Sequence, residues 1–146
     1  MTAHARVQPA LWIDMLSAAE MQREMDAIGP LLLDVLNRRD SLRLFRPSDV
    51  LDRCADGRWQ MWAAFRPALV AICVTNVEIY PLAKVLNFLL LAGHDMVAWL
   101  PGIRQIHQWA RGHDCTVSQV YGRRGWSRLL EPLGFKHECD MMRMAL

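Results

Sequence analysis

The sequence predicts a single α/β domain in which a mixed β-sheet carries helices on both faces. Three observations lead to this fold class. The first part of the chain has apolar residues at helical spacing, and three segments rich in strand-forming residues then follow one another between residues 59 and 91. After residue 91, helical and extended patterns alternate. Consecutive strands pair antiparallel and a strand–helix–strand crossover adds a parallel strand, so the sheet is expected to be mixed.

The composition supports one folded domain. The chain has 146 residues, of which 53% are hydrophobic and 22% are charged, so it can bury a sizeable core and is not disordered. We expect a single domain over residues 1–146, with an N-terminal helical part at about residues 10–56 and a sheet-forming core at about residues 59–146. The net charge of +2 gives no electrostatic basis for nucleic-acid binding. The longest apolar run, residues 85–92, is interrupted by Asn87 and is too short to cross a membrane.

Four cysteines and the N-terminal sequence bear on the compartment. Cys54, Cys73, Cys115 and Cys139 lie in separate segments without a Cys-x-x-Cys pair, a usage typical of reduced thiols. The N-terminus lacks a basic region followed by an apolar core, so no signal peptide is expected. We therefore expect a cytoplasmic protein.

Helical signals dominate the first third of the chain. Residues 11–28 carry apolar positions at helical spacing, which predicts an amphipathic helix. Gly29 and Pro30 are expected to interrupt it, with Pro30 starting a second helix to about residue 38. A short helix is predicted after Ser48, which would cap it, and Asp56-Gly57 is predicted to form a turn.

Strand signals follow. Residues 59–65 form one candidate strand, and residues 68–80 form a second because β-branched side chains are frequent there. Pro81 ends the second strand, since proline cannot donate to a ladder. Residues 84–91 are almost continuously apolar, which predicts a central strand covered on both faces.

The last third alternates between the two patterns. Residues 95–112 carry a helical stripe of Trp99, Leu100, Ile103 and Ile106, with a kink or restart at Pro101. A strand at 115–121, a short helix at 125–133 and a closing strand at 135–146 are expected to follow. We expect the strand at 84–91 to lie beside the strand at 115–121 and parallel to it.

This order of elements resembles the GNAT superfamily of N-acetyltransferases. The residues that carry the resemblance are the central strand at 86–91, the helix after it, the run Gly-Arg-Arg-Gly-Trp at 122–126 and the sequence Leu-Gly-Phe at 133–135. Together with Trp109-Ala110-Arg111, that run makes small GNAT-like proteins of phages and prophages the most similar group. The resemblance covers about residues 59–146, and it implies a GNAT-like mixed sheet and acetyl-CoA as the acyl donor.

The resemblance also assigns a coenzyme site and shows two departures from the family pattern. Coenzyme binding is expected at Leu91, Ala92 and Gly93, where the family has a glycine-rich turn that holds the pyrophosphate. Asp95 here puts a negative charge near that turn. The family's proton-donating tyrosine corresponds to Leu130, which cannot protonate a thiolate. Tyr121, at the end of the preceding strand, is the nearby substitute.

Three further side chains were weighed as candidate acids or bases. Glu78 shares a strand face with Asn76 and Tyr80, and its carboxylate is suited to deprotonating an amine; the alternative is a solvated charge at a strand end. His94 follows the central strand at an edge where ligands bind in open α/β sheets. There it would act as a base oriented by Asp95, although we favour Asp95 as a helix cap. His107 falls on the apolar stripe and is expected to be a packed core residue.

Two sequence patterns suggest ion binding. Gly122-Arg123-Arg124-Gly125 joins a strand to a helix, so Arg123 and Arg124 are candidates for binding the coenzyme's phosphate, or are simply surface charges. His113/Cys115 and His137/Cys139 are two His-x-Cys pairs on predicted strands. Neither spacing matches the common zinc motifs, so no metal is expected.

We therefore predict a GNAT-like N-acyltransferase with altered catalytic motifs that uses acetyl-CoA on an amine, with Glu78 and Tyr121 as catalytic residues. The alternative is a non-catalytic phage protein of this fold, acting as a virion or assembly component or as a binder of host proteins. Six tryptophans and nine methionines would give it a surface for a protein partner or for self-association. Neither nucleic acid nor membrane is expected as a partner.

Overall fold

The protein contains one mixed, five-stranded sheet. The computed structural model describes residues 11–39, 43–94, 96–122 and 124–146. The strands lie in the order β1-β2-β3-β4-β5. They are β1 (Trp12–Met15), β2 (Trp59–Phe65), β3 (Leu69–Tyr80), β4 (Ala83–Gly93) and β5 (Cys115–Val120). Neighbours from β1 to β4 are antiparallel, and β5 is parallel to β4, so the mixed sheet predicted from the sequence is confirmed.

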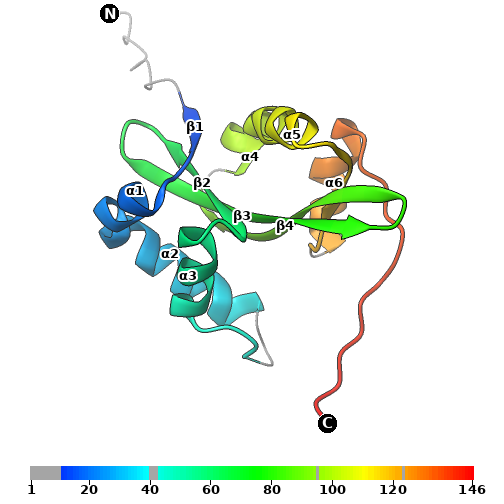
Figure 1. The fold of residues 1–146 in the computed structure, drawn as a ribbon, viewed down its shortest axis with the longest axis horizontal. Coiled ribbons are helices and arrows are strands. Elements are labelled where there is room, and N and C mark those ends of the chain that lie inside the picture. The colour runs from blue at the N-terminus through cyan, green and yellow to red at the C-terminus, as the bar shows by residue number, and fades with distance from the viewer. Residues whose placement is uncertain (1–10, 40–42, 95, 123) are drawn as a thin grey trace, which may run out of the picture.

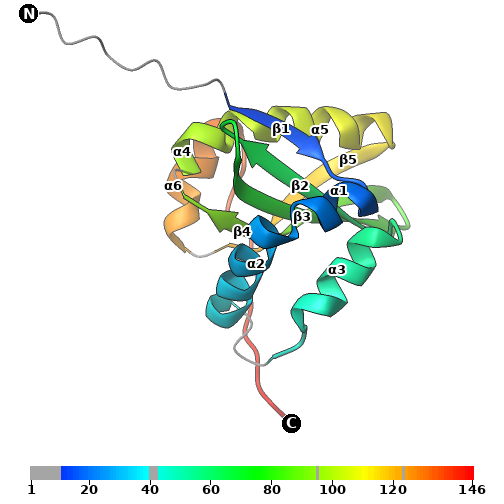
Figure 2. The ribbon, with the colours of Figure 1, turned by 90° about the vertical axis from the view of Figure 1, so that its left-hand side faces the viewer.

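Helices cover both faces of this sheet (Figure 1). On one side lie α1 (Ala18–Arg23), α2 (Met25–Arg39) and α3 (Pro47–Ala55). On the other side lie α4 (Met96–Trp99) and α5 (Ile103–Gly112), and α6 (Ser127–Leu130) follows β5 (Figure 2). Two clusters of buried apolar side chains result, one under α2 and α3 and one under α5, so the sheet separates two cores.

The N-terminal prediction is wrong in one respect, because the first element of the described residues is a strand. Residues Trp12–Met15 pair with β2, and the Trp12 ring stacks on the Phe65 ring at 5.5 Å between centroids. The helix starts only after Ser17. The Ser17 hydroxyl accepts a hydrogen bond from the Glu20 backbone N–H at 3.1 Å, and the Glu20 carboxylate accepts one from the Ser17 N–H at 3.2 Å. This reciprocal cap fixes the helix boundary.

The next two helix boundaries also differ from the prediction. Helix α2 runs through Gly29 and Pro30 without interruption. Ile28 and Leu32 are fully buried on either side of the proline, so packing against the sheet offsets the lost backbone hydrogen bond. Helix α3 begins at Pro47 and is capped from Arg46, not from Ser48. The Asp49 carboxylate accepts hydrogen bonds from the Arg46 side chain and backbone, which lowers the pKa of Asp49 to about 2.

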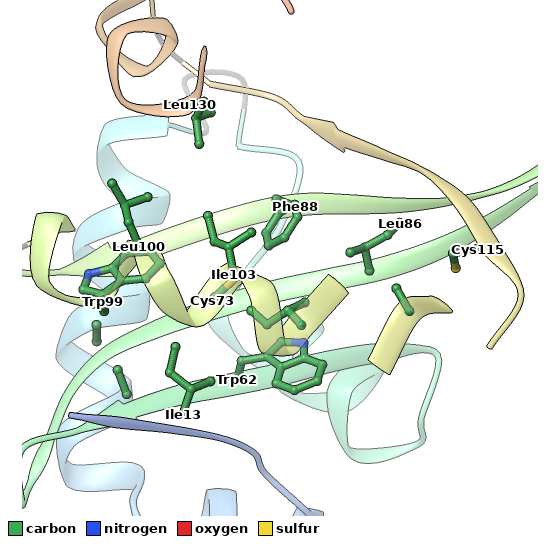
Figure 3. Close-up of a cluster of buried hydrophobic side chains, with 14 residues drawn as sticks. Ile13, Trp62, Cys73, Leu86, Phe88, Trp99, Leu100, Ile103, Cys115 and Leu130 are labelled. Atoms are coloured by element: carbon green, nitrogen blue, oxygen red, sulfur yellow. The ribbon is translucent and has the colours of Figure 1, made fainter. Parts of the chain in front are cut away.

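The central elements match the prediction closely. The strands expected at 59–65, 68–80, 84–91 and 115–121 are β2, β3, β4 and β5, and the turn at Asp56-Gly57 is present. The crossover after β4 consists of α4, a 3₁₀ turn at Leu100–Gly102 that contains Pro101, and α5. Its predicted stripe of Trp99, Leu100, Ile103 and Ile106 is buried against the sheet (Figure 3).

The end of the chain departs most from the prediction. The helix expected at 125–133 is α6 flanked by two 3₁₀ turns, Arg124–Trp126 and Glu131–Leu133, and Leu133 is exposed. The closing strand expected at 135–146 is not formed. These residues are an extended arm that runs away from the body (Figure 1), and every residue from Lys136 to Leu146 is exposed. A strand requires a pairing neighbour, and in the described part of the chain the arm has none.

Candidate coenzyme and acyl-transfer site

Strand β4 opens away from β5 halfway along its length. The pairing of β4 with β5 extends from Lys84 to Phe88 and ends where Phe88 lies opposite Val120. On the other side, β4 stays paired with β3 as far as Gly93. From Leu89 to Gly93, therefore, one edge of β4 has backbone groups that no strand uses. An open strand edge can accept a ligand that carries amide groups.

A β-bulge lies where the opening begins. Val74 of β3 is opposite Leu90 and Thr75 is opposite Phe88, so Leu89 is the extra residue on β4. Bulges bend the strand that contains them and are frequent beside active sites. The bulge thus lies where β4 stops pairing with β5.

The three predicted coenzyme-binding residues of β4 lie on this open edge. Leu91 packs against the core under α5, whereas Ala92 is buried in the core under α2 and α3. Gly93 has a φ of 142°, and a Cβ atom there would lie 2.5 Å from the Cβ of Ala71. Only glycine fits this close approach to β3. Backbone groups of Leu91–Gly93, rather than their side chains, are therefore what the edge offers a ligand.

The predicted phosphate-binding groups are only partly described. Asp95 and Arg123 lie outside the described residues, and Arg124 begins the 3₁₀ turn after β5. Helix α4, which follows β4, spans four residues. So short a helix has a weak macrodipole, since that dipole sums the peptide dipoles along the helix. The structure thus has an open backbone edge on β4, followed by a short helix rather than a long one.

A row of three amide side chains crosses the sheet beside the opening. Asn87 donates to the Asn76 side-chain oxygen at 3.0 Å, and Gln119 donates to the Asn87 side-chain oxygen at 2.8 Å. Asn87 is fully buried and lies one residue before the end of the β4–β5 pairing. In the sequence, Asn87 stands out only as an interruption of an apolar run. A polar residue inside a buried strand was the available signal for this row.

The two predicted catalytic side chains, Glu78 and Tyr121, both influence Tyr80. The Tyr80 hydroxyl donates to the Glu78 carboxylate at 2.8 Å. This hydrogen bond and the carboxylate charge raise the pKa of Tyr80, and Tyr121 adds a smaller contribution in the same direction. Tyr121 directly follows Val120 and is therefore next to the opening. Glu78 lies opposite Val85 of β4. Val85 is four residues before Leu89, where the opening begins, which is roughly 13 Å along the strand. Glu78 is therefore set back from the opening.

Two other side chains occupy the face under α5. Leu130 is 5% exposed and packs in the core at the position where the resemblance expects a proton-donating tyrosine (Figure 3). His107 is packed as expected: its Nε2 lies 2.8 Å from the Ser118 hydroxyl oxygen, and its ring meets the Phe88 ring edge-on. Burial lowers the pKa of His107, and the nearby Arg111 charge lowers it further. Neither residue reaches the opening as a proton donor.

A cavity of about 420 Å³ lies at the carboxyl end of β4, on the side of α2. Its walls are mainly apolar, and Asp26, Arg66 and His94 also line it. The volume suits a small molecule or part of one. His94 therefore lines a cavity at the carboxyl end of β4, and its proposed partner Asp95 is outside the described residues.

The two His-x-Cys pairs are not brought together. His113 Nδ1 lies 2.9 Å from the Trp109 carbonyl oxygen, and His137 pairs with Asp140 on the exposed arm. They do not face each other because the arm is not a strand beside β5. In the part of the chain that the structure describes, no three His, Cys, Asp or Glu side chains form a group that could hold a metal ion. None of the described helices is long and apolar enough to span a membrane.

Comparison with known proteins identifies the fold. No protein-family model and no curated protein matches the sequence. Among solved structures, a probable acetyltransferase superimposes with a TM-score of 0.70 at 13% identity, over 92% of this chain and 96% of the other. Ribosomal-protein-alanine N-acetyltransferase from Brucella melitensis gives 0.69 at 14%, over 94% and 99%. A GNAT family acetyltransferase from Staphylococcus aureus gives 0.64 at 8%, over 94% and 99%. The chain therefore has the GNAT acetyltransferase fold.

Proposed function

We propose that the protein is an acyltransferase that uses acetyl-CoA to acetylate an amine. The observation that carries this proposal is the open edge of β4 from Leu89 to Gly93, beside a β-bulge and at the end of the β4–β5 pairing. Acetyl-CoA supplies a thioester whose acyl group is reactive toward amines. Its pantetheine arm carries two amide groups, which match a strand edge with free donors and acceptors.

In this proposal, two residues handle the protons: Tyr121 beside the opening and Glu78, which is set back from it. Tyr121 lies next to the end of the pairing, and its hydroxyl is the nearest described candidate to protonate the leaving sulfur. Glu78 accepts the proton of the attacking amine, directly or through the Tyr80 hydroxyl that it already binds. Asn87, held by Asn76 and Gln119, keeps β3, β4 and β5 in register beside the opening. Arg123 and Arg124 follow Tyr121 and are proposed to contact the coenzyme's phosphate.

A specific observation favours a second candidate, a non-catalytic protein of this fold. Leu130 is buried where the family resemblance expects the proton donor, and Glu78 is set back from the opening. A chain of phage or prophage origin with this fold would then act as a virion or assembly component, or would bind a host protein.

Titration with acetyl-CoA separates the two candidates. Acetyl-CoA at about 100 times its Kd should stabilise the protein by roughly 2.7 kcal/mol, visible as a rise in Tm. Absence of any shift at millimolar acetyl-CoA would leave the non-catalytic candidate.

Two fragments of the coenzyme sharpen this experiment. Phosphopantetheine carries the amide-bearing arm, and adenosine 3′,5′-bisphosphate carries phosphates without the arm. We expect phosphopantetheine to retain measurable binding, because the backbone edge is formed and α4 is short. If only the bisphosphate binds, the β4 edge is not the coenzyme site.

A further inference from the structure

The outer edge of β5 is unusual for a sheet edge. Its sequence, Cys-Thr-Val-Ser-Gln-Val, has no charge and no proline, and β4 is its only strand neighbour in the described chain. Natural edge strands are normally protected by charges, prolines, bulges or short length, because a bare edge pairs with other chains. The opposite edge is protected in this way: β1 has four residues, contains Asp14, and its Ile13 carbonyl accepts a hydrogen bond from the Gln105 side chain at 2.8 Å.

The C-terminal arm, residues 135–146, is the second unpaired extended segment. It contains neither proline nor glycine, and its charges, Lys136, Glu138, Asp140 and Arg143, balance. Met141, Met142, Met144 and Leu146 are each more than half exposed. The sequence predicted a surface rich in tryptophan and methionine. The methionines of the arm are exposed, whereas Trp62 and Trp99 are buried. An exposed apolar segment that is extended like a strand tends to associate with another surface.

The arm starts beside β5. The Phe135 ring lies 5.8 Å from the His107 ring, and His107 contacts Ser118 of β5 at 2.8 Å. From this point the arm runs away from its own sheet in both views (Figures 1 and 2). Residues 136–146 would extend over roughly 36 Å, and the six residues of β5 over roughly 20 Å, so one arm is long enough to cover one edge.

We propose that two copies of the chain exchange arms, with the arm of each copy adding as a strand to the β5 edge of the other. This arrangement pairs the β5 edge of each copy with the arm of the other through one two-fold contact, which closes at a dimer. The proposal does not depend on the proposed acyltransferase function.

Sedimentation of the intact chain over a range of concentrations tests this proposal. We expect a monomer–dimer equilibrium, with slow amide hydrogen exchange in residues 115–120 and 136–146 only in the dimer. Successive backbone N–H groups of a strand point to opposite sides, so only one of Met141 and Met142 would donate its N–H to β5. Replacing that residue with proline removes the donor. That variant should weaken dimerisation at least about tenfold.

Met141→Ala and Met142→Ala are the matched controls, since they shorten the same side chains and keep the N–H groups. Dimerisation should be weakened less by each alanine than by the more disruptive proline. A chain that stays monomeric at every concentration, including one whose arm folds onto its own β5, contradicts the proposal. A dimer that neither proline variant weakens also contradicts the proposal. A dimer that the alanine variants weaken as much as the proline variants contradicts it too.

Discussion

The two halves of β4 differ in what lies beside them. From Lys84 to Phe88 the strand is covered by β3 on one side and β5 on the other, and its side chains Leu86, Asn87 and Phe88 are almost completely buried. From Leu89 to Gly93 the pairing with β3 continues, but the β5 side is open. The first half of the strand therefore holds the sheet together, and the second half has the edge that we propose as the ligand site. Substitutions in the two halves should show this division.

The largest effect on stability is expected in the paired half, from Phe88→Ala. Phe88 is 1% exposed and contacts the core under α5 (Figure 3). Removing its ring leaves a cavity, and the expected loss is about 3–5 kcal/mol of unfolding free energy. Urea denaturation measures it. Leu82→Ala, at a fully exposed position of the β3–β4 turn, is the control and should change stability little. A small loss for Phe88→Ala would mean that the paired half does not dominate stability.

At the open half, Tyr121→Phe should affect catalysis and leave stability unchanged. The substitution removes only a hydroxyl from a side chain that is 45% exposed. If Tyr121 protonates the leaving sulfur, kcat should fall about 100-fold or more while acetyl-CoA affinity is retained. Thiol release from acetyl-CoA in the presence of a panel of amines measures the rate. Tyr80→Phe is the matched control: it breaks the hydrogen bond to Glu78 and should lower kcat less.

Gly93→Ala tests the end of the open half. The backbone at Gly93 has a φ of 142°, and the added Cβ would lie 2.7 Å from the Val70 carbonyl oxygen. The strain from this conformation alone is about 1–3 kcal/mol. We expect a lower Tm together with weaker acetyl-CoA binding, because β4 must move away from β3 at this position. Gly112→Ala, where a Cβ would meet nothing within 4 Å, is the control.

Asn87→Ala tests the amide row in the paired half. The substitution leaves the Gln119 amide donor and the Asn76 oxygen without their partner at the centre of the row, at a cost of about 1–3 kcal/mol. Asn76→Ala removes one end of the row, where the structure is only half-buried, and should cost less. Thermal unfolding of both variants gives the comparison. Equal losses of stability in Asn87→Ala and Asn76→Ala would contradict the expectation that the central residue of the row contributes more than its end.

The smallest effect is expected from the titration of His107, which packs against Phe88 in the paired half. Burial holds the pKa of His107 below its ordinary value of 6.5. The unfolded chain therefore binds this proton more readily than the folded protein does. The resulting stability is fully present above about pH 6.5 and is lost as the pH falls toward the depressed value. Unfolding free energies between pH 7.5 and 5.5 should decline in the parent protein and decline less in His107→Gln.

Much of the fold could be predicted from the sequence because it depends on local patterns. Strands β2 and β3 follow from β-branched and aromatic runs that end at Pro67 and Pro81. The helical stripe of α5 follows from residues spaced three and four apart. The parallel β4–β5 pair follows from the crossover between them.

The candidate site was predicted less completely. Leu91, Ala92 and Gly93 were proposed through family resemblance and Tyr121 through its place at the end of a strand, and their roles stay predictions. Asn76, Asn87 and Gln119 were not grouped, because they are 11 and 32 residues apart and are joined only by the pairing of three strands. Glu78 was placed on the correct face, but its distance from the opening depends on where β4 pairs with β3.

The sequence by itself determined the type and face of most elements, since side-chain period and backbone preference act within a few residues. The tertiary structure decided that Trp12–Met15 is a strand, that Pro30 stays within α2, that Leu89 forms a bulge and that the arm after Phe135 has no partner in its own sheet. Each of these outcomes depends on contacts between residues far apart in the chain. The point at which β4 stops pairing with β5 is also decided by the tertiary structure, and it defines the candidate site.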